Sequence, residues 1–217
     1  MMRLRSDAHA HEKLAARPER VVILDPDHPE DLSTVSTKDT MAVELGCGKG
    51  GFITALAPKH PDVHFFAFEK YETILVKALK KYDRNPVDTI TFVSGDATMI
   101  DALFPPQSVQ TLYLNFSDPW PKARHEKRRL TTPSRLEKYH RILKDDGEIR
   151  FKTDNRSLFF YSLATLKASG FEINDFTTDL KQTSWDNTPT EFEERYGKTY
   201  PIHACVARKK VIHGSRL

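Results

Sequence analysis

Long apolar runs are missing from this chain, and cysteine is scarce. No window approaches the roughly 18 uninterrupted apolar residues that a spanning helix needs, and the start of the chain, residues 1–7, lacks the apolar core of a secretion signal. We therefore expect a cytoplasmic protein with no membrane partner. The two cysteines, Cys47 and Cys205, lie in a glycine-rich loop and in a late apolar run, and a reducing compartment favours free thiols at both.

A large excess of either charge is also absent. The 217 residues carry a formal net charge of +3, and 39% are hydrophobic, which is typical of an ordinary globular protein with one substantial core. The distribution of charge is more informative. Acidic residues gather at 25–31 and 191–194, whereas cations gather at 122–129. This positive patch is either a solvated face or a contact for an anionic partner.

Short apolar runs alternate with helical patterns along most of the chain. The predicted strands are 41–43, 63–68, 89–93, 109–116 and 148–151, and the predicted helices between them are 52–57, 71–82, 99–104 and 134–143. A helix at 157–168 ended by Gly170, a strand at 171–176, a short helix at 190–196 and an apolar run at 200–206 follow. The alternation implies parallel strands with right-handed helical crossovers. It predicts an α/β fold with a doubly wound, mostly parallel, Rossmann-like sheet.

The chain divides into two parts of unequal character. Residues 1–38 have weak periodicity and read as an N-terminal extension with one short helix at 9–17. Residues 39–217 form a single domain. Within it we distinguish a basic loop, 117–130, and a polar loop, 177–198.

Glycines cluster directly after the first predicted strand, in the segment Glu44-Leu45-Gly46-Cys47-Gly48-Lys49-Gly50-Gly51. Glycines between a strand and a helix let a ligand approach the backbone closely. The spacing also fits dinucleotide-binding loops, but Glu44 is expected of methyltransferases that bind S-adenosylmethionine. A carboxylate here would repel a pyrophosphate, whereas it suits a ligand with an ammonium group, a sulfonium and no phosphate. We therefore favour the methyl donor.

Acidic residues also end the next two strands. Glu69 can accept hydrogen bonds from both ribose hydroxyls, and Asp96, followed by Ala97, can reach an adenine amine. Polar strand ends alone would explain any one of these acids. Three of them together with the glycine loop favour a cofactor site.

A stiff, charged loop follows the strand at 109–116. It reads Asn115-Phe116-Ser117-Asp118-Pro119-Trp120-Pro121-Lys122 and runs into Arg124-His125-Glu126-Lys127-Arg128-Arg129. Its prolines end regular pairing, so Asp118 and Trp120 should lie at a strand's end, where open α/β sheets bind ligands. The Asp-Pro-Trp sequence is similar to the Asp-Pro-Pro-Tyr or Trp loops of amino-group methyltransferases, without their second proline.

Further motifs extend the similarity over essentially the whole chain. They are Met2-Arg3-Leu4-Arg5, the glycine loop, Glu69, Gly95-Asp96-Ala97, Phe151-Lys152-Thr153-Asp154-Asn155 and Thr190-Glu191-Phe192-Glu193. Together with the basic loop, they closely resemble the bacterial tRNA (guanine-N7)-methyltransferases, a class I family with a C-terminal antiparallel strand.

This resemblance implies S-adenosylmethionine as cofactor, tRNA as partner, and a monomer or homodimer. The implied product is N7-methylguanosine in the tRNA variable loop, at position 46, with S-adenosylhomocysteine released. Cofactor contacts are implied for Glu44, Gly46, Gly48, Glu69, Asp96, Ala97 and Asp118, with Asp118 also catalytic. Substrate contacts are implied for Lys122, Arg124, Lys127, Arg128, Arg129, Asp154, Thr190, Glu191, Phe192 and Glu193.

The chemistry agrees with these residues. Guanine N7 has an in-plane lone pair and no proton, so it can attack a sulfonium methyl directly and needs alignment more than a general base. Asp118 can accept hydrogen bonds from guanine N1–H and the 2-amino group, and its charge favours the cationic product. Alternatively, Asp118 only caps a turn. Trp120 either stacks on a base or packs against the core.

Other interpretations stay open. Asp154 can cap the helix that follows it, and Glu193 can be a surface charge. With the same cofactor, the acceptor can be a small molecule or an exocyclic amine. A tRNA-binding protein with a degenerate cofactor pocket is a third possibility. His60 and His64 have a metal-binding spacing for a helix, but their segment contains a proline and leads into a strand, so we expect no metal site.

Overall fold

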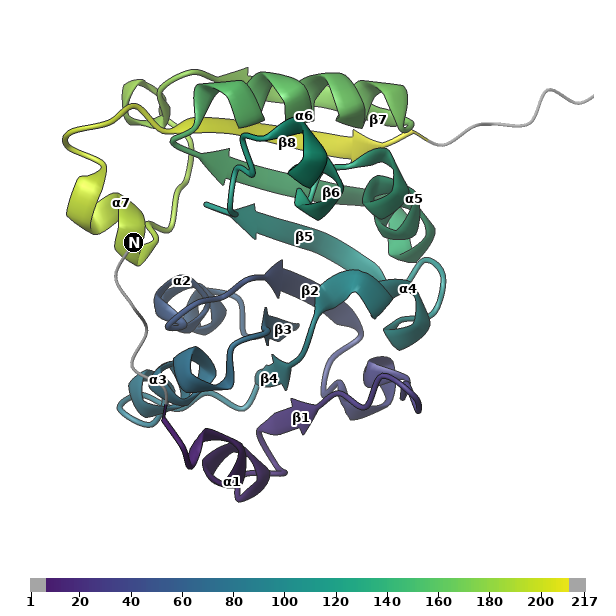
Figure 1. The fold of residues 1–217 in the computed structure, drawn as a ribbon, viewed down its shortest axis with the longest axis vertical. Coiled ribbons are helices and arrows are strands. Elements are labelled where there is room, and N and C mark those ends of the chain that lie inside the picture. Colours follow the sequence, from purple (N-terminus) through teal and green to yellow (C-terminus); the bar gives the residue numbers. More distant parts are fainter. Residues whose placement is uncertain (1–6, 211–217) are drawn as a thin grey trace, which may run out of the picture.

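The computed structural model describes residues 7–210, which form one eight-stranded sheet with strand order β1-β4-β3-β2-β5-β6-β8-β7. The strands are β1 (Val21–Ile23), β2 (Thr40–Leu45), β3 (Val63–Glu69), β4 (Ile90–Ser94), β5 (Val109–Asn115), β6 (Leu143–Thr153), β7 (Phe171–Thr177) and β8 (His203–Lys209). β1 to β6 are parallel, and β8 is antiparallel to both β6 and β7. The expected mostly parallel sheet with an antiparallel C-terminal strand is confirmed (Figure 1).

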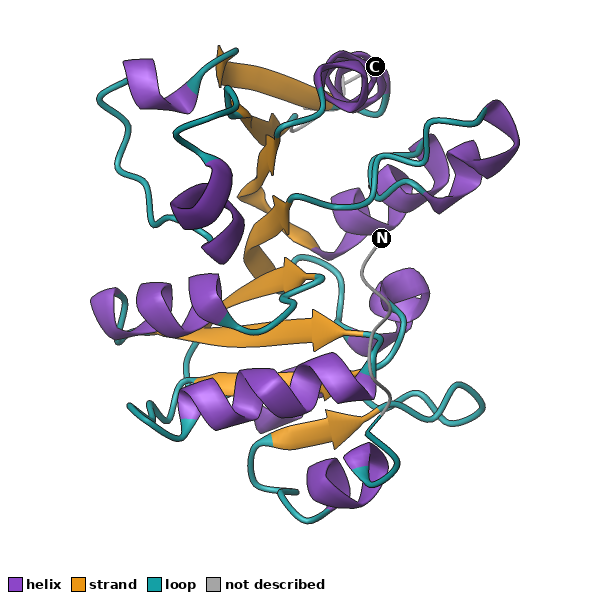
Figure 2. Ribbon diagram, turned by 60° about the vertical axis from the view of Figure 1, so that its left-hand side comes forward, coloured by secondary structure: helices purple, strands orange, loops and turns teal. Residues whose placement is uncertain are grey.

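Helices cover both faces of the sheet (Figure 2). One layer holds α1 (Ala10–Ala15), α2 (Gly51–Leu56) and α3 (Glu72–Tyr82), and the other holds α4 (Ile100–Leu103), α5 (Pro133–Ile142) and α6 (Arg156–Ala168). Short 3-10 turns are η1 (Leu32–Val35), η2 (Ala57–Lys59), η3 (Ala97–Met99), η4 (Ala123–Arg128) and η5 (Leu180–Gln182). The last helix, α7 (Glu191–Tyr196), belongs to neither layer and lies beside α2 (Figure 1). Within residues 7–210, no helix is long and apolar enough to cross a membrane.

The central strand β3 shows why the sheet is buried on both sides. Phe66 and Phe68 belong to the core cluster under α4 to α6, whereas Phe65 belongs to the cluster under α1 to α3. A nearly continuous apolar strand is the pattern of a parallel sheet with two covered faces. His64 on this strand is buried, and its ring nitrogens contact the hydroxyls of Thr37 at 3.1 Å and Thr91 at 2.9 Å. Burial lowers the pKa of His64 to about 4, so it is a neutral structural residue.

The N-terminal segment is more integrated than its weak periodicity suggested. Strand β1 pairs with β4 at the edge of the sheet, and Leu14 and Val21 are buried in the core that α2 and α3 share. The sequence did not predict β1, because four apolar residues followed by Asp25-Pro26 are too short a pattern. The described part of the expected extension thus completes the sheet. The Met-Arg-Leu-Arg motif at 2–5 lies outside the described residues.

The remaining elements follow the predictions with shifts at their ends, the largest at β6, which begins at Leu143, five residues earlier than expected. Strand β8 begins at His203, three residues later than expected, because Pro201 has no N–H to donate to a ladder. Gly170 has φ +83, the left-handed conformation that ends α6 as predicted. Cys47 and Cys205 are both buried and free.

Candidate active site

The predicted cofactor residues lie along one edge of the sheet. Strands β4, β3, β2 and β5 are neighbours in that order, and their carboxyl ends lead to Asp96, Glu69, Glu44 and Asp118, respectively. Three strand spacings separate the first of these ends from the last, a span of about 14 Å. This row is the edge at which open α/β sheets bind ligands.

A cavity of about 240 Å³ opens at the middle of this edge. It is lined by Glu44, Gly46, Cys47, Gly48, Lys49, Gly51, Phe52, Asn115, Phe116, Thr190, Glu191 and Phe192. The sequence predicted Glu44, Gly46 and Gly48 for the cofactor, and it predicted the segment 190–193 for the substrate. The structure therefore brings the glycine loop and the polar loop to one cavity.

Glu44 gives the cavity its electrostatic character. Its side chain is buried, and Oε1 accepts a hydrogen bond from Nδ2 of Asn115 at 2.9 Å. Oε2 of Glu44 and Oδ1 of Asn115 are buried without a hydrogen-bond partner. Burial raises the pKa of Glu44 to about 7. Two unpaired acceptors beside a cavity fit a ligand that brings an ammonium group.

The glycine loop leaves room for such a ligand. Gly46 and Gly48 have φ +80 and +57, and a Cβ at either position would meet no atom within 4 Å. The N–H of Gly48 donates to Oε2 of Glu69 at 3.2 Å, and the N–H of Tyr71 donates to Oε1 at 2.9 Å. Burial raises the pKa of Glu69. Glu69 is therefore bound to the glycine loop, which itself lines the cavity.

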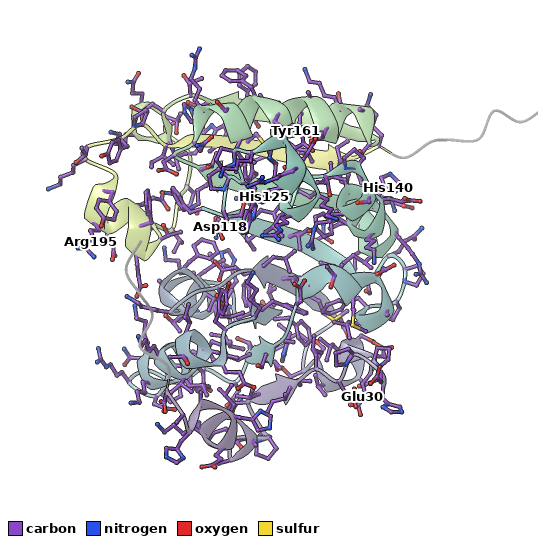
Figure 3. The ribbon with its side chains drawn as sticks, in the orientation of Figure 1. Glu30, Asp118, His125, His140, Tyr161 and Arg195 are labelled. Carbon is purple, nitrogen blue, oxygen red and sulfur yellow. The ribbon has the colours of Figure 1, made fainter. Side chains whose placement is uncertain are left out.

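Asp96 and Ala97 lie one strand beyond Glu69, outside the cavity lining. Asp96 is exposed, and its Oδ1 caps η3 by accepting from the N–H of Thr98 at 2.8 Å. At the opposite end of the row, Asp118 is exposed on the loop after β5 (Figure 3). Phe116 and Trp120, two residues to either side of it, have positive φ angles of 49 and 42.

The basic loop presents most of its cations to solvent. Lys122, Arg124, Lys127 and Arg128 are exposed on or beside η4. Arg129 is half-buried and donates to the backbone carbonyls of Pro119 and Trp120.

The indole of Trp120 does not enter the core. It contacts the guanidinium of Arg128, 4.8 Å from the ring centroid, and the edge of His125 at 5.6 Å. Asp154 is exposed, and the N-cap of α6 is Asn155, which accepts from the N–H of Leu158 at 2.8 Å. The alternative role of Asp154 as a helix cap is therefore wrong.

The segment 190–193 begins α7 and closes one side of the cavity. Phe192 lies against Phe116, with ring centroids 4.6 Å apart. Thr190 and Glu193 form a capping box, in which Oε2 of Glu193 accepts from the N–H of Thr190 at 2.8 Å. Glu193 also binds Lys152, which belongs to the motif at 151–155 but for which no role was predicted. The sequence did contain a signal for this contact: a lysine within an apolar strand is buried and therefore needs an acidic or polar partner.

A larger cavity of about 340 Å³ lies beside the first, over the face of the sheet that α2 covers. The two cavities share Phe52 and Asn115. Of these two cavities, the smaller is the one that the glycine loop and Glu44 line. No group of three or more side chains that could hold a metal ion occurs among residues 7–210.

Comparison with known proteins identifies the family. A family model described as "Putative methyltransferase" matches residues 38–201. The chain is 43% identical over 210 residues to the tRNA (guanine-N(7)-)-methyltransferase of Geobacillus kaustophilus, covering 95% of this chain and 96% of the relative. It is 39% identical over 211 residues to that of Lachnoclostridium phytofermentans, covering 95% and 98%. The chain belongs to the tRNA (guanine-N7)-methyltransferase family.

Solved methyltransferase structures share the fold of this family member. An antibiotic-related methyltransferase superposes with a TM-score of 0.60 at 18% identity, covering 79% of this chain and 88% of that one. A SAM-dependent methyltransferase from Aquifex aeolicus gives 0.56 at 11% identity, covering 78% and 82%. Family membership and fold together establish an S-adenosylmethionine-dependent methyltransferase.

Proposed function

We propose that this protein transfers the methyl group of S-adenosylmethionine to N7 of a guanine in tRNA. The observation that carries the proposal is the buried, unpartnered Oε2 of Glu44, which lies beside a glycine loop and one strand from the loop of Asp118. Relatives named tRNA (guanine-N(7)-)-methyltransferase support the choice of substrate. The proposal includes the variable loop as the modified region, a cytoplasmic location, and a monomer or homodimer.

The cofactor roles follow from the row of strand ends. When bound, S-adenosylmethionine supplies a sulfonium methyl group that a ring nitrogen can attack. The ionised Glu44, with Asn115, binds its ammonium group, and Gly46 and Gly48 allow close approach to the backbone. Glu69 accepts from the ribose hydroxyls, and Asp96 with Ala97 contacts the adenine. Each role uses a group that the structure places at the same edge.

Asp118 orients the guanine. Its carboxylate accepts hydrogen bonds from N1–H and the 2-amino group, which fixes the ring so that N7 faces the methyl group. Because N7 loses no proton, no general base is required at this position. The negative charge of Asp118 also stabilises the cationic methylated base.

The exposed cations of the basic loop bind the RNA backbone. Lys122, Arg124, Lys127 and Arg128 contact phosphates, which positions the tRNA without reading its sequence. Arg129 was predicted to share this role, but its guanidinium donates to the backbone carbonyls of Pro119 and Trp120. Thr190, Glu191 and Phe192 line the cavity, and Asp154 follows β6, the strand beside β5. These residues and Glu193 are proposed to contact the substrate.

Unmodified tRNA transcripts incubated with labelled S-adenosylmethionine test the activity. The expected product is N7-methylguanosine, detected by chemical cleavage of the RNA at that base and by nucleoside analysis after digestion. A transcript with adenine in place of the variable-loop guanine serves as the control. Label in another nucleoside, or only in a small acceptor, would refute the N7 assignment.

Asp118→Ala tests the proposed catalytic residue. With S-adenosylmethionine at saturating concentration, we expect turnover to fall by a factor on the order of 10² to 10³, as for the loss of one stabilising group; calorimetry measures separately how far the variant binds the cofactor more weakly. Asp175→Ala, an exposed carboxylate on the edge strand β7, is the matched control. Near-normal turnover and guanine specificity in Asp118→Ala would exclude Asp118 from the chemistry.

A further inference from the structure

Arg129 differs from the other cations of the basic loop. Arg124, Lys127 and Arg128 are exposed, whereas Arg129 is half-buried. Its Nε donates to the carbonyl of Pro119 and its Nη2 to the carbonyl of Trp120, both at 3.1 Å. The fork of the guanidinium is therefore directed at the backbone directly after Asp118.

The other side of this guanidinium rests on helix α6. Its Cζ lies 4.4 Å from the ring centroid of Tyr161, a cation–π contact. Two residues further on, the hydroxyl of Thr131 contacts that of Ser162, buried on the same helix, at 2.7 Å. The chain at 129–131 is thus fixed to α6. Arg129 links that helix to the loop of Asp118.

The loop that Arg129 holds has a strained backbone. Phe116 and Trp120 both adopt positive φ angles, 49 and 42, which are unfavourable for bulky side chains. Such conformations persist only when the surrounding structure enforces them. The carbonyl of Trp120 is one of the two acceptors of Arg129, so the guanidinium acts at the strained residue itself.

We propose that Arg129 is a positioning residue, which holds the Asp118 loop in its active conformation instead of binding RNA phosphate. This inference rests on the proposed function, because the guanine-orienting role of Asp118 is what gives the loop its importance. Without Arg129, the loop relaxes toward unstrained conformations and Asp118 moves. A displacement of about 1 Å at a reacting group can reduce the rate by about 100-fold.

Arg129→Ala and Arg129→Lys test this with tRNA at saturating concentration. We expect both to lower kcat by about 100-fold, because a lysine ammonium cannot reproduce the two-pronged fork. The salt dependence of tRNA binding should stay that of the wild type. Arg128→Ala is the contrasting variant, since it should weaken tRNA binding and flatten its salt dependence. Arg208→Ala controls for loss of any arginine, because Arg208 is an exposed residue of β8 that pairs with Glu148, away from the carboxyl ends of the parallel strands.

Two further measurements separate positioning from general damage. Guanidinium ion at millimolar concentration should partly restore kcat in Arg129→Ala and should have no effect on Arg128→Ala. Tyr161→Phe keeps the ring and should retain kcat, whereas Tyr161→Leu should lower it. Unfolding temperature and S-adenosylmethionine affinity, measured for each variant, establish that the fold persists.

A measurement without substrate keeps this inference separate from the proposed function. In a Trp185→Phe background, the fluorescence of Trp120 reports the loop alone, and Arg129→Ala should change its emission and increase its mobility. Failure of the wild type to form N7-methylguanosine would refute the function and leave this test standing. Unchanged Trp120 emission, or normal kcat with a raised KM for tRNA and a flattened salt dependence in Arg129→Ala, would overturn the positioning role.

Discussion

The ammonium of Lys152 lies 2.8 Å from Oε2 of Glu193, and the two side chains are only 9% and 7% exposed. The same ammonium donates to Oδ1 of Asn187 and to the carbonyl of Thr188, both at 3.1 Å. Nδ2 of Asn187 in turn donates to Oε1 of Glu193 at 3.0 Å. All the partners of Lys152 in this group belong to the loop 177–198, so strand β6 anchors that loop.

Two other lysines contact the same loop from elsewhere in the fold. Lys81 on α3 pairs with Glu191, and Lys59 on η2 donates to the hydroxyl of Thr188 at 3.1 Å. Glu191 lies directly over the start of α2, where a Cβ on Gly51 would approach its Cγ to 2.5 Å. The loop is therefore held beside the 240 Å³ cavity from three elements, and its position sets the shape of that cavity.

Lys152→Met should destabilise the protein by about 3 to 5 kcal/mol, because it leaves Glu193 buried without its cation. It should also weaken S-adenosylmethionine binding, since the loop that closes the cavity loses its anchor. Chemical denaturation and calorimetry measure the two effects. As a control, Lys13→Met removes the ion pair between Lys13 and Asp7. Its N···O distance of 2.7 Å is nearly the same, but its two side chains are 46% and 27% exposed. That control should lose no more than about 1 kcal/mol.

The double variant Lys152→Met with Glu193→Gln sharpens this test. Glutamine at 193 removes the buried charge and can still close the capping box with Thr190. The double variant should therefore be more stable than Lys152→Met alone. Equal stability of the two would contradict a cost for leaving the Glu193 charge buried without its cation.

The fold and the row of acidic strand ends were predictable because their signals are local. Apolar strands, the glycine loop and the acids at strand ends occur within a few residues of each other, and the parallel topology then aligns Glu44 and Glu69. Strand β1 was not predictable, because Val21–Ile23 is too short for a period and forms only by pairing with β4.

The contacts that shape the site were not predictable, because they join distant segments. Lys152 and Glu193 are 41 residues apart, and only the antiparallel pairing of β8 with β6 brings the polar loop to the lysine. Arg129 was predicted from its basic neighbours to bind RNA, but sequence cannot show that its guanidinium binds carbonyls. Substrate contact by Glu193 stays a prediction, since both of its oxygens already have protein partners.

Replacing Lys127 and Arg128 together by alanine should weaken tRNA binding and reduce its dependence on salt. Both side chains are exposed on η4, and each phosphate contact contributes roughly 0.7 to 0.9 to the slope of log affinity against log salt. The slope should therefore fall by about 1.4 to 1.8 in titrations between low and moderate salt. S-adenosylmethionine binding should be unaffected. An unchanged slope would show that this surface is only solvated.

Glu44→Gln should stabilise the ligand-free protein at neutral and alkaline pH. Burial raises the pKa of Glu44 from 4.5 to about 7, so the folded state retains a proton that the unfolded state releases between these values. Wild-type stability is therefore lost as pH rises from 4.5 to 7, by at most about 3 kcal/mol. Relative to the wild type, the free energy of unfolding of Glu44→Gln should be higher by this amount above pH 7 and only slightly higher at pH 4.5. Denaturation curves at both pH values measure the difference.

The same carboxyl should make S-adenosylmethionine binding depend on pH. Binding the ammonium group requires ionised Glu44, so affinity should rise by up to tenfold per pH unit below about 7 and level off above it. Calorimetry between pH 5.5 and 7.5 should show proton release on binding. Because the charge of Lys152 lowers the pKa of Glu44, Lys152→Met should move the midpoint to higher pH. In Glu44→Gln the affinity should be weak at every pH, and a retained pH dependence there would assign the titration to another group.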